Sequence, residues 1–234
     1  NLEEFYLLKK KYNFFLIEDA CHALGSNYKV KNKIQKIGSC NYSDICTFSF
    51  HPLKSITTGE GGCVTTNNQK LANKMYIFRS HGISRKSYFD YDIKNLGFNY
   101  RLSDINSALG ITQLKKLNLF IKRRKQIAKL YISKLNKINS FIETPEYDEY
   151  SAWHLFRLRV LKNKKGLIKF LQKNKIFTQI HYKPIHSFSF YKSKEKLKNS
   201  EKYFEETLSL PIYYSLSNED IGRICNLLKN FYVK

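Results

Sequence analysis

Four polar side chains lie at or just after the ends of two apolar runs in the sequence. Asp19 ends the first run and His22 follows it, while Ser49 lies near the end of the second run and Lys54 follows it. Taken singly, such an aspartate is commonly a helix cap and such a lysine a solvated cation. In open α/β sheets, however, ligands bind beyond the carboxyl ends of the strands. We therefore expect these four groups to meet at one edge of a sheet.

Lys54 stands out because of the segment around it. It lies between two apolar strands and is followed by Thr57, Thr58 and a glycine-rich turn in which Glu60 is embedded. This arrangement suits a lysine held in a cleft, where loss of water makes an amine nucleophilic toward carbonyl carbons.

The pattern predicts the elements that must position these residues. Apolar runs predict buried strands, and a spacing near 3.6 predicts helices. Ser217, followed three residues later by Asp220, is a helix start signal. We expect a helix over 2–11, a buried parallel strand over 13–19, strands over 45–50 and 63–66, a long helix over 102–138, a loop over 143–150, a strand over 153–161, a helix over 164–173, an extended segment over 176–182 and a final helix after residue 217.

These elements predict an α/β protein with two regions. Residues 1–118 would form part of a large α/β domain, and residues 119–234 the connecting helix and a small α+β domain. The chain begins at Asn1 and enters its sheet almost at once, and three strands make a poor doubly wound sheet. We therefore expect an N-terminally truncated chain.

The composition sets limits on other functions. The net charge of +22 would attract polyanions, but only 8 of the 41 basic residues are Arg and they are scattered with many Asn and Ile, so we favour a general Lys/Asn/Ile bias over a nucleic-acid-binding face. A basic polyanion-binding protein stays a remote alternative. Five cysteines without a CxxC pair predict a reducing, cytoplasmic setting and no metal site. The sequence also predicts no membrane span and no secretion signal.

Several blocks in order resemble the DegT/DnrJ/EryC1/StrS family of nucleotide-sugar aminotransferases, which use pyridoxal 5′-phosphate (PLP). The blocks are EDACHALGS at 18–26, FSFHPLK at 48–54, TGEGG at 58–62, RSHG at 79–82 and GFNYRLSD at 97–104, with QIHYKPIH at 179–186 and SLP at 209–211. The resemblance implies the aspartate-aminotransferase fold (fold type I). Residues 1–118 would then be the C-terminal part of the large PLP-binding domain.

Within the family, the sequence looks most like the branch that serves pseudaminic acid biosynthesis. The implied reaction transfers an amino group, with glutamate as the expected donor, to C4 of a UDP-linked 4-keto-6-deoxy-HexNAc. Alternatives are another sugar aminotransferase of the family or a sugar dehydratase. In the dehydratase branch the anchoring lysine is commonly replaced by His, so Lys54 argues against it.

The resemblance also implies a role for each candidate residue. Lys54 would hold the cofactor and move a proton, and Asp19 would keep the pyridine nitrogen protonated. His22 would lie near the ring hydroxyl, and Ser49 would donate to the phosphate. Asn99 would reach the phosphate of the neighbouring subunit's cofactor, which implies a homodimer with shared active sites.

Other motif residues receive weaker assignments. His181 and His186 are candidates for binding the sugar nucleotide, with structural roles as the alternative. His51, Glu60 and Arg101 match motif positions but receive no separate chemical step.

The sequence departs from the family at the cofactor site. The family's second phosphate-binding loop, with a Gly-Thr pair, and the aromatic residue that stacks on the ring lie well upstream of the Asp block, and this chain has neither. We therefore expect the complete protein to be an active transaminase, and the chain as written to bind the cofactor weakly or not at all and to be inactive alone.

Overall fold

A computed structural model describes residues 1–191 and 194–233, and the chain divides into two units. Unit 1 consists of Asn1–Asn118 with Tyr150–Ala152, and unit 2 of Leu119–Glu149 with Trp153–Lys234. Each unit is described by itself. In the described residues, every helix falls short of the length or the apolar character that a membrane crossing needs.

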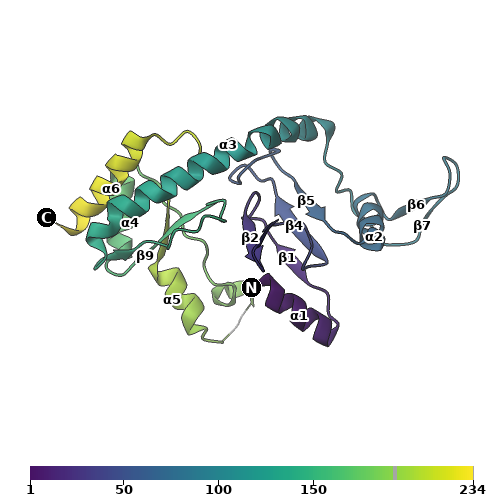
Figure 1. The fold of residues 1–234 in the computed structure, drawn as a ribbon, viewed down its shortest axis with the longest axis horizontal. Helices are drawn as coiled ribbons and strands as arrows, with labels where there is room; N and C mark the ends of the chain where they lie inside the picture. The colour runs from purple at the N-terminus through teal and green to yellow at the C-terminus, as the bar shows by residue number, and fades with distance from the viewer. Residues whose placement is uncertain (192–193, 234) are drawn as a thin grey trace. The chain divides into compact units, whose positions relative to one another are not determined.

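Unit 1 is built around a three-stranded sheet with the order β1-β4-β5. Strand β1 runs parallel to β4 and places Asp19 opposite Thr47, while β5 runs antiparallel to β4 and places Gly62 opposite Ser49. In chain order, the elements of unit 1 are α1 (Leu2–Tyr12), β1 (Ile17–Asp19), β2 (Asn27–Val30), β3 (Lys33–Lys36), β4 (Ile45–Ser49), β5 (Gly62–Thr65), α2 (Gln69–Arg79), β6 (Ile83–Arg85), β7 (Tyr91–Ile93) and the first part of α3 (Asp104–Leu135) (Figure 1).

The expectation of a buried parallel strand over 13–19 is confirmed for its parallel pairing and wrong for its length and its burial. Strand β1 has three residues, and the side chains of Ile17 and Phe15 are 58% and 73% exposed. The reason is that β1 lies at the edge of its sheet and α1 buries none of its own residues, so among the described residues little covers this apolar run. The sequence shows that this run is apolar, but whether its side chains are buried depends on which other elements pack against them.

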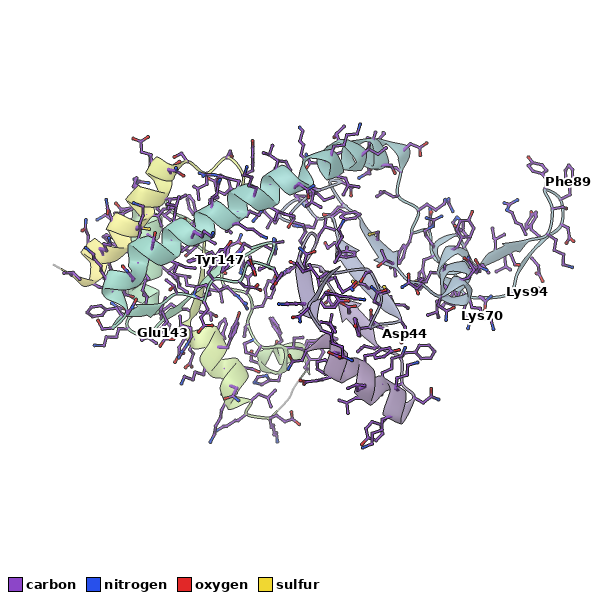
Figure 2. All side chains as sticks on the ribbon, in the orientation of Figure 1. Asp44, Lys70, Phe89, Lys94, Glu143 and Tyr147 are labelled. Atoms are coloured by element: carbon purple, nitrogen blue, oxygen red, sulfur yellow. The ribbon has the colours of Figure 1, made fainter. Side chains whose placement is uncertain are left out.

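A nearly buried ion pair ties α1 to the sheet. Lys9 Nζ lies 2.6 Å from Asp44 Oδ1, and the two side chains are only 19% and 15% exposed. Asp44 Oδ2 also accepts the Leu16 backbone N–H at 2.8 Å, and the Asp44 N–H donates to the Leu16 carbonyl at 2.9 Å. Asp44, labelled in Figure 2, therefore fixes both the helix and the approach to β1.

Two hairpins of unit 1 lie outside the predicted elements. Strands β2 and β3 pair antiparallel around Lys31 and Asn32, whose φ angles are 45° and 66°. Strands β6 and β7 form the second hairpin, and Phe89 at its tip is 89% exposed (Figure 2).

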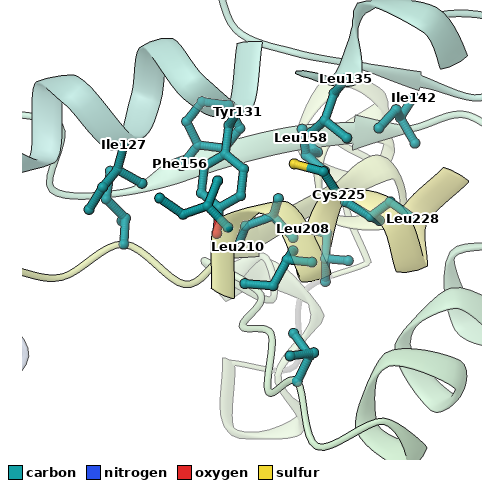
Figure 3. Close-up of a cluster of buried hydrophobic side chains, with 14 of the residues drawn as sticks. Ile127, Tyr131, Leu135, Ile142, Phe156, Leu158, Leu208, Leu210, Cys225 and Leu228 are labelled. Carbon is teal, nitrogen blue, oxygen red and sulfur yellow. The ribbon is translucent and has the colours of Figure 1, made fainter. Parts of the chain in front are cut away.

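Unit 2 is an antiparallel sheet with the order β10-β9-β8, packed with helices. Its largest apolar cluster draws on α3, β8, β9, α4, β10 and α6 and includes Tyr131, Phe156 and Leu208 (Figure 3). In chain order, the elements are the second part of α3, η1 (Asn136–Ile138), β8 (Ile142–Glu143), β9 (Phe156–Val160), α4 (Lys164–Lys173), η2 (Ile185–Ser187), η3 (Ser189–Tyr191), α5 (Lys198–Glu206), β10 (Thr207–Leu210) and α6 (Asn218–Tyr232).

Local signals placed the helices of unit 2 well. Ser217 Oγ accepts the Asp220 N–H at 2.9 Å, so the predicted start of the last helix is confirmed. The helix predicted over 164–173 is confirmed as α4. The extended segment predicted over 176–182 contributes a single isolated bridge, between Gln179 and Ser209.

Candidate active site

The parallel pairing of β1 with β4 brings Asp19 and Ser49 to one edge of the sheet. Asp19 is the last residue of β1 and Ser49 the last residue of β4. The Ala20 N–H donates to the Thr47 carbonyl at 2.9 Å, which continues the ladder past Asp19. The carboxyl ends of these two strands therefore lie where ligands bind in open α/β sheets.

The Asp19 carboxylate is held in its ionised form. Hydrogen bonds from the thiol and the backbone N–H of Cys21 lower the pKa of Asp19, burial raises it, and the charges of His22 and Lys54 lower it by smaller amounts, so the net shift is downward. The Cys21 N–H donates to Asp19 Oδ1 at 3.1 Å. The hydrogen bonds of Cys21 are therefore the main cause of the lowered pKa.

Lys54 lies in a loop, residues 50–61, that is closed by its own hydrogen bonds. The Phe50 N–H donates to the Gly61 carbonyl at 2.8 Å, and the Thr58 N–H donates back to the Phe50 carbonyl at 3.0 Å. The Lys54 N–H donates to the His51 carbonyl at 2.9 Å. The neighbouring Ser55, Ile56 and Thr58 are buried, whereas Lys54 is half-buried. The loop is thus anchored on both sides of the amine.

The glycine turn after this loop leaves no room for side chains. A Cβ on Gly62 would lie 2.5 Å from the Phe48 carbonyl oxygen, a distance that real Cβ atoms essentially never show. Gly61 has a φ of 154°, a conformation that other residues rarely adopt. These two glycines let the chain leave the Lys54 loop and enter β5 directly beside β4.

Glu18 precedes Asp19 but serves the other face of the sheet. Successive side chains of a strand point to opposite faces. Glu18 accepts a hydrogen bond from the buried Ser43 hydroxyl. Burial raises the pKa of Tyr28 and of the Cys46 thiol, and the charge of Glu18 adds to both shifts. The two adjacent carboxylates therefore have separate surroundings.

The structure places two of the five predicted cofactor residues, Asp19 and Ser49, at the ends of the paired strands β1 and β4. His22 is exposed and acts with Lys54 on the pKa of Asp19. Ser49 is the end of the neighbouring strand, and its Oγ accepts the His51 N–H at 3.4 Å. Asn99 is exposed and forms an isolated bridge with Ser80, in a separate segment of unit 1.

The two substrate candidates belong to unit 2 and have partners there. His181 Nδ1 lies 2.9 Å from Ser209 Oγ, and His186 Nε2 lies 3.1 Å from Glu201 Oε1. The His186 side chain is largely buried. These contacts fit the structural alternative, and binding of a sugar nucleotide by either residue stays a prediction.

The remaining motif residues lie around the loop and after the second hairpin. His51 Nε2 and Glu60 Oε1 are 4.0 Å apart across the loop, and both side chains are well exposed. Arg101 is exposed. Among the described residues, no group of three or more His, Cys, Asp and Glu is arranged to hold a metal ion.

Sequence reasoning missed Asn106, which contacts the Lys54 loop from α3. Its side-chain amide donates to the carbonyls of Thr58 and Glu60. The available signal was an amide residue three positions after Ser103 at the start of a helix, which is the spacing of a capping box. That spacing predicts a contact within the helix and gives no hint of the loop 48 residues earlier in the chain.

Comparisons with known proteins agree with this geometry. Residues 1–229 match the DegT/DnrJ/EryC1/StrS aminotransferase family. The chain is 41% identical over 228 residues to the UDP-4-amino-4,6-dideoxy-N-acetyl-beta-L-altrosamine transaminase of Campylobacter jejuni, which covers 94% of this chain and 59% of that protein. The chain thus spans about three fifths of the length of this curated relative.

Two solved structures show the same fold. The chain superposes on PseC of Helicobacter pylori, an aminotransferase involved in the biosynthesis of pseudoaminic acid, with a TM-score of 0.90 and 34% identity, covering 99% of this chain and 63% of that one. It also superposes on the PLP form of the putative sugar aminotransferase Spr1654 of Streptococcus pneumoniae, with a TM-score of 0.82 and 29% identity, covering 95% of this chain and 59% of that one. The predicted fold type is confirmed.

Proposed function

Because the chain belongs to the DegT/DnrJ/EryC1/StrS aminotransferase family, we propose that it carries the catalytic lysine and aspartate of a PLP-dependent sugar aminotransferase. The proposed reaction transfers an amino group from glutamate to C4 of a UDP-linked 4-keto-6-deoxy-HexNAc, in biosynthesis of the pseudaminic acid type. The names of the Campylobacter and Helicobacter relatives support this substrate class. The observation that carries the proposal is the parallel pairing of β1 with β4, which brings Asp19 to the same edge of the sheet as Ser49, five residues before Lys54.

The residues at this edge fit pyridoxal 5′-phosphate. The cofactor, when bound, supplies an electron sink for the carbon that gains or loses the amino group. A carboxylate that is already ionised suits a protonated pyridine nitrogen, and the low pKa of Asp19 provides one. The Ser49 hydroxyl at the end of β4 can donate to a phosphate oxygen.

Asp19 and Lys54 have distinct tasks in this reaction. Asp19 would hold a proton on the ring nitrogen of the bound cofactor, because its negative charge would stabilise the positive charge there. Lys54 would anchor the cofactor and would serve as the acid and base that moves a proton at the substrate carbon. Its half-buried loop, fixed by hydrogen bonds on both sides, limits the positions that the amine can take.

The finer assignments complete the proposal. We propose that His22 lies near the ring hydroxyl, that His181 and His186 contact the sugar nucleotide, and that Asn99 acts on the cofactor of a second subunit in a homodimer with shared sites. The cytoplasmic location stays a prediction.

Borohydride trapping tests the proposal directly. The full chain is incubated with excess PLP, reduced with borohydride, digested and mapped by mass spectrometry. Because we expect the chain as written to bind the cofactor weakly, we expect a low yield of pyridoxyl adduct, formed on Lys54 in preference to the exposed Lys94 and Lys115, and we expect Asp19→Asn to weaken that preference. An adduct spread evenly over the exposed lysines, with none on Lys54, would refute the catalytic assignment. The yield also measures how well the chain as written binds the cofactor.

A further inference from the structure

We propose that Asn106 is a positioning residue for Lys54, acting through the loop of residues 50–61. The inference rests on the proposed function of Lys54, since it assigns to Asn106 the task of holding that amine in place. Asn106 lies on α3 and takes no direct part in the proposed reaction.

The Asn106 amide is satisfied on both sides. Its Nδ2 donates to the Thr58 carbonyl and, at 3.3 Å, to the Glu60 carbonyl. Its Oδ1 accepts the Ser103 hydroxyl. One side chain therefore bridges two carbonyls of the loop while a neighbour on its own helix fixes the orientation of its amide.

The two bridged carbonyls belong to the hydrogen-bonded frame that carries Lys54. The Thr58 N–H and the Thr57 hydroxyl both donate to the Phe50 carbonyl, at 3.0 Å each. Between these ends, the Lys54 N–H donates to the His51 carbonyl. A shift of Thr58 would therefore move the base of the loop on which the lysine stands.

Close packing makes the contact between helix and loop specific. Thr58 is 2% exposed, and a Cβ on Gly110 of α3 would lie 2.8 Å from its methyl group. The helix thus approaches Thr58 at a glycine, one turn after Asn106. Because Thr58 is a buried residue, its carbonyl needs a hydrogen-bond donor, and the Asn106 amide supplies one from α3.

The alternative is that Asn106 only caps its helix. The cap, however, uses the Ser103 hydroxyl as acceptor and the Asn106 backbone N–H as donor, at 3.3 Å. The side-chain amide of Asn106 points to the loop instead. A substitution can therefore remove the bridge and leave the cap in place.

Asn106→Leu is the test variant, with Asn118→Leu as its control. Leucine has a similar size, carries no charge and favours helices more than asparagine does, so the variant removes the amide without weakening α3. Asn118 is an exposed asparagine of the same helix. Asn106→Gln returns the amide group and serves as the rescue.

Two measurements on the full chain without cofactor decide the proposal. Hydrogen exchange follows the amides of Phe50 and Thr58, and reductive methylation followed by peptide mass spectrometry gives the rate and pH profile of Lys54 relative to exposed Lys115. We expect Asn106→Leu to speed exchange and Lys54 methylation about tenfold, as the loss of one to two net hydrogen bonds predicts. Asn118→Leu should match the unsubstituted chain, and Asn106→Gln should lie closer to it than Asn106→Leu does.

Each other result overturns the proposal. If exchange speeds up but the Lys54 profile stays unchanged, Asn106 is merely structural. If Asn106→Gln behaves like Asn106→Leu, the amide is not the group that matters. Neither arm uses the cofactor, so a failure here is distinct from a failure of the borohydride experiment, which tests the role of Lys54 itself.

Discussion

Tyr131 offers a sharp measure of what a hydrogen bond from a fully buried tyrosine contributes to unit 2. Its ring centroid lies 4.8 Å from that of Phe156 (Figure 3), and its hydroxyl donates to the Pro211 carbonyl at 2.9 Å. Tyr131→Phe removes one oxygen atom and leaves that carbonyl without this donor. An unsatisfied buried acceptor costs about 1–3 kcal/mol, and the Pro211 carbonyl belongs to a partly buried residue. We expect the free energy of unfolding to fall by about 1 kcal/mol, the lower end of that range.

Tyr232 provides the matched control. Its hydroxyl donates to the Lys162 carbonyl, also at 2.9 Å, but this bond is exposed. In Tyr232→Phe, water can take the place of the hydroxyl, so we expect a loss within about 0.5 kcal/mol. The two variants make the same chemical change on the same kind of acceptor and differ in access to water.

Urea titration followed by tryptophan fluorescence is the assay. Trp153 is the single tryptophan of the chain and stacks on Phe156, with ring centroids 5.9 Å apart, so its emission reports on unit 2. Equal losses in the two variants, or no loss in Tyr131→Phe, would show that burial of the tyrosine does not set the cost.

Two further predictions concern unit 1. Burial raises the pKa of Asp44, but hydrogen bonds from Lys9 and Leu16 outweigh burial and hold that pKa below its usual range. The Lys9–Asp44 pair therefore stabilises the fold above about pH 4, and this contribution is lost as the pH falls. Circular dichroism in an acid titration should show that loss of stability. Lys9→Met should lower the free energy of unfolding by up to about 3 kcal/mol at neutral pH and make stability depend less on acid. If the acid titration curves of Lys9→Met and the unsubstituted chain coincide, the Lys9–Asp44 pair is not the cause. Burial and the Asp19 carboxylate both raise the pKa of the Cys21 thiol, so Asp19→Asn should shift its alkylation profile to lower pH. Cys63, whose pKa burial alone raises, is the internal control, and an unmoved Cys21 profile would disprove the contact.

Local sequence signals predicted the elements whose causes are local. Ser217 marks the start of α6 because its hydroxyl caps a helix within three residues. The β2–β3 hairpin was missed because its turn uses Lys31 and Asn32 at positive φ, where the usual signal is Asn-Gly. Strand β10 was missed although Thr207-Leu208-Ser209-Leu210 alternates polar and apolar residues, because the run is only four residues long and follows α5 directly, without a turn signal to mark its start.

In the candidate site, too, some residues could be predicted from the sequence and others could not. Asp19 and Ser49 could be predicted, because the ends of parallel strands meet at one edge of a sheet. Asn106 could not, because its partners lie in a loop that only the folded chain brings to α3. The exposure of Ile17 is likewise a property of its neighbours and not of its own run.

The pairing of β1 with β4 also determines which face of the sheet each of two adjacent carboxylates occupies. Glu18 meets Ser43 on one face and Asp19 meets Cys21 on the other, and the backbone bonds at Leu16 and Ala20 lock that frame. Inserting or deleting one residue before Ala20 would exchange the two carboxylates, and the longer side chain would then face the amine. Substitutions in this segment leave each position on its face of the sheet, whereas a change of one residue in its length moves each side chain to the opposite face.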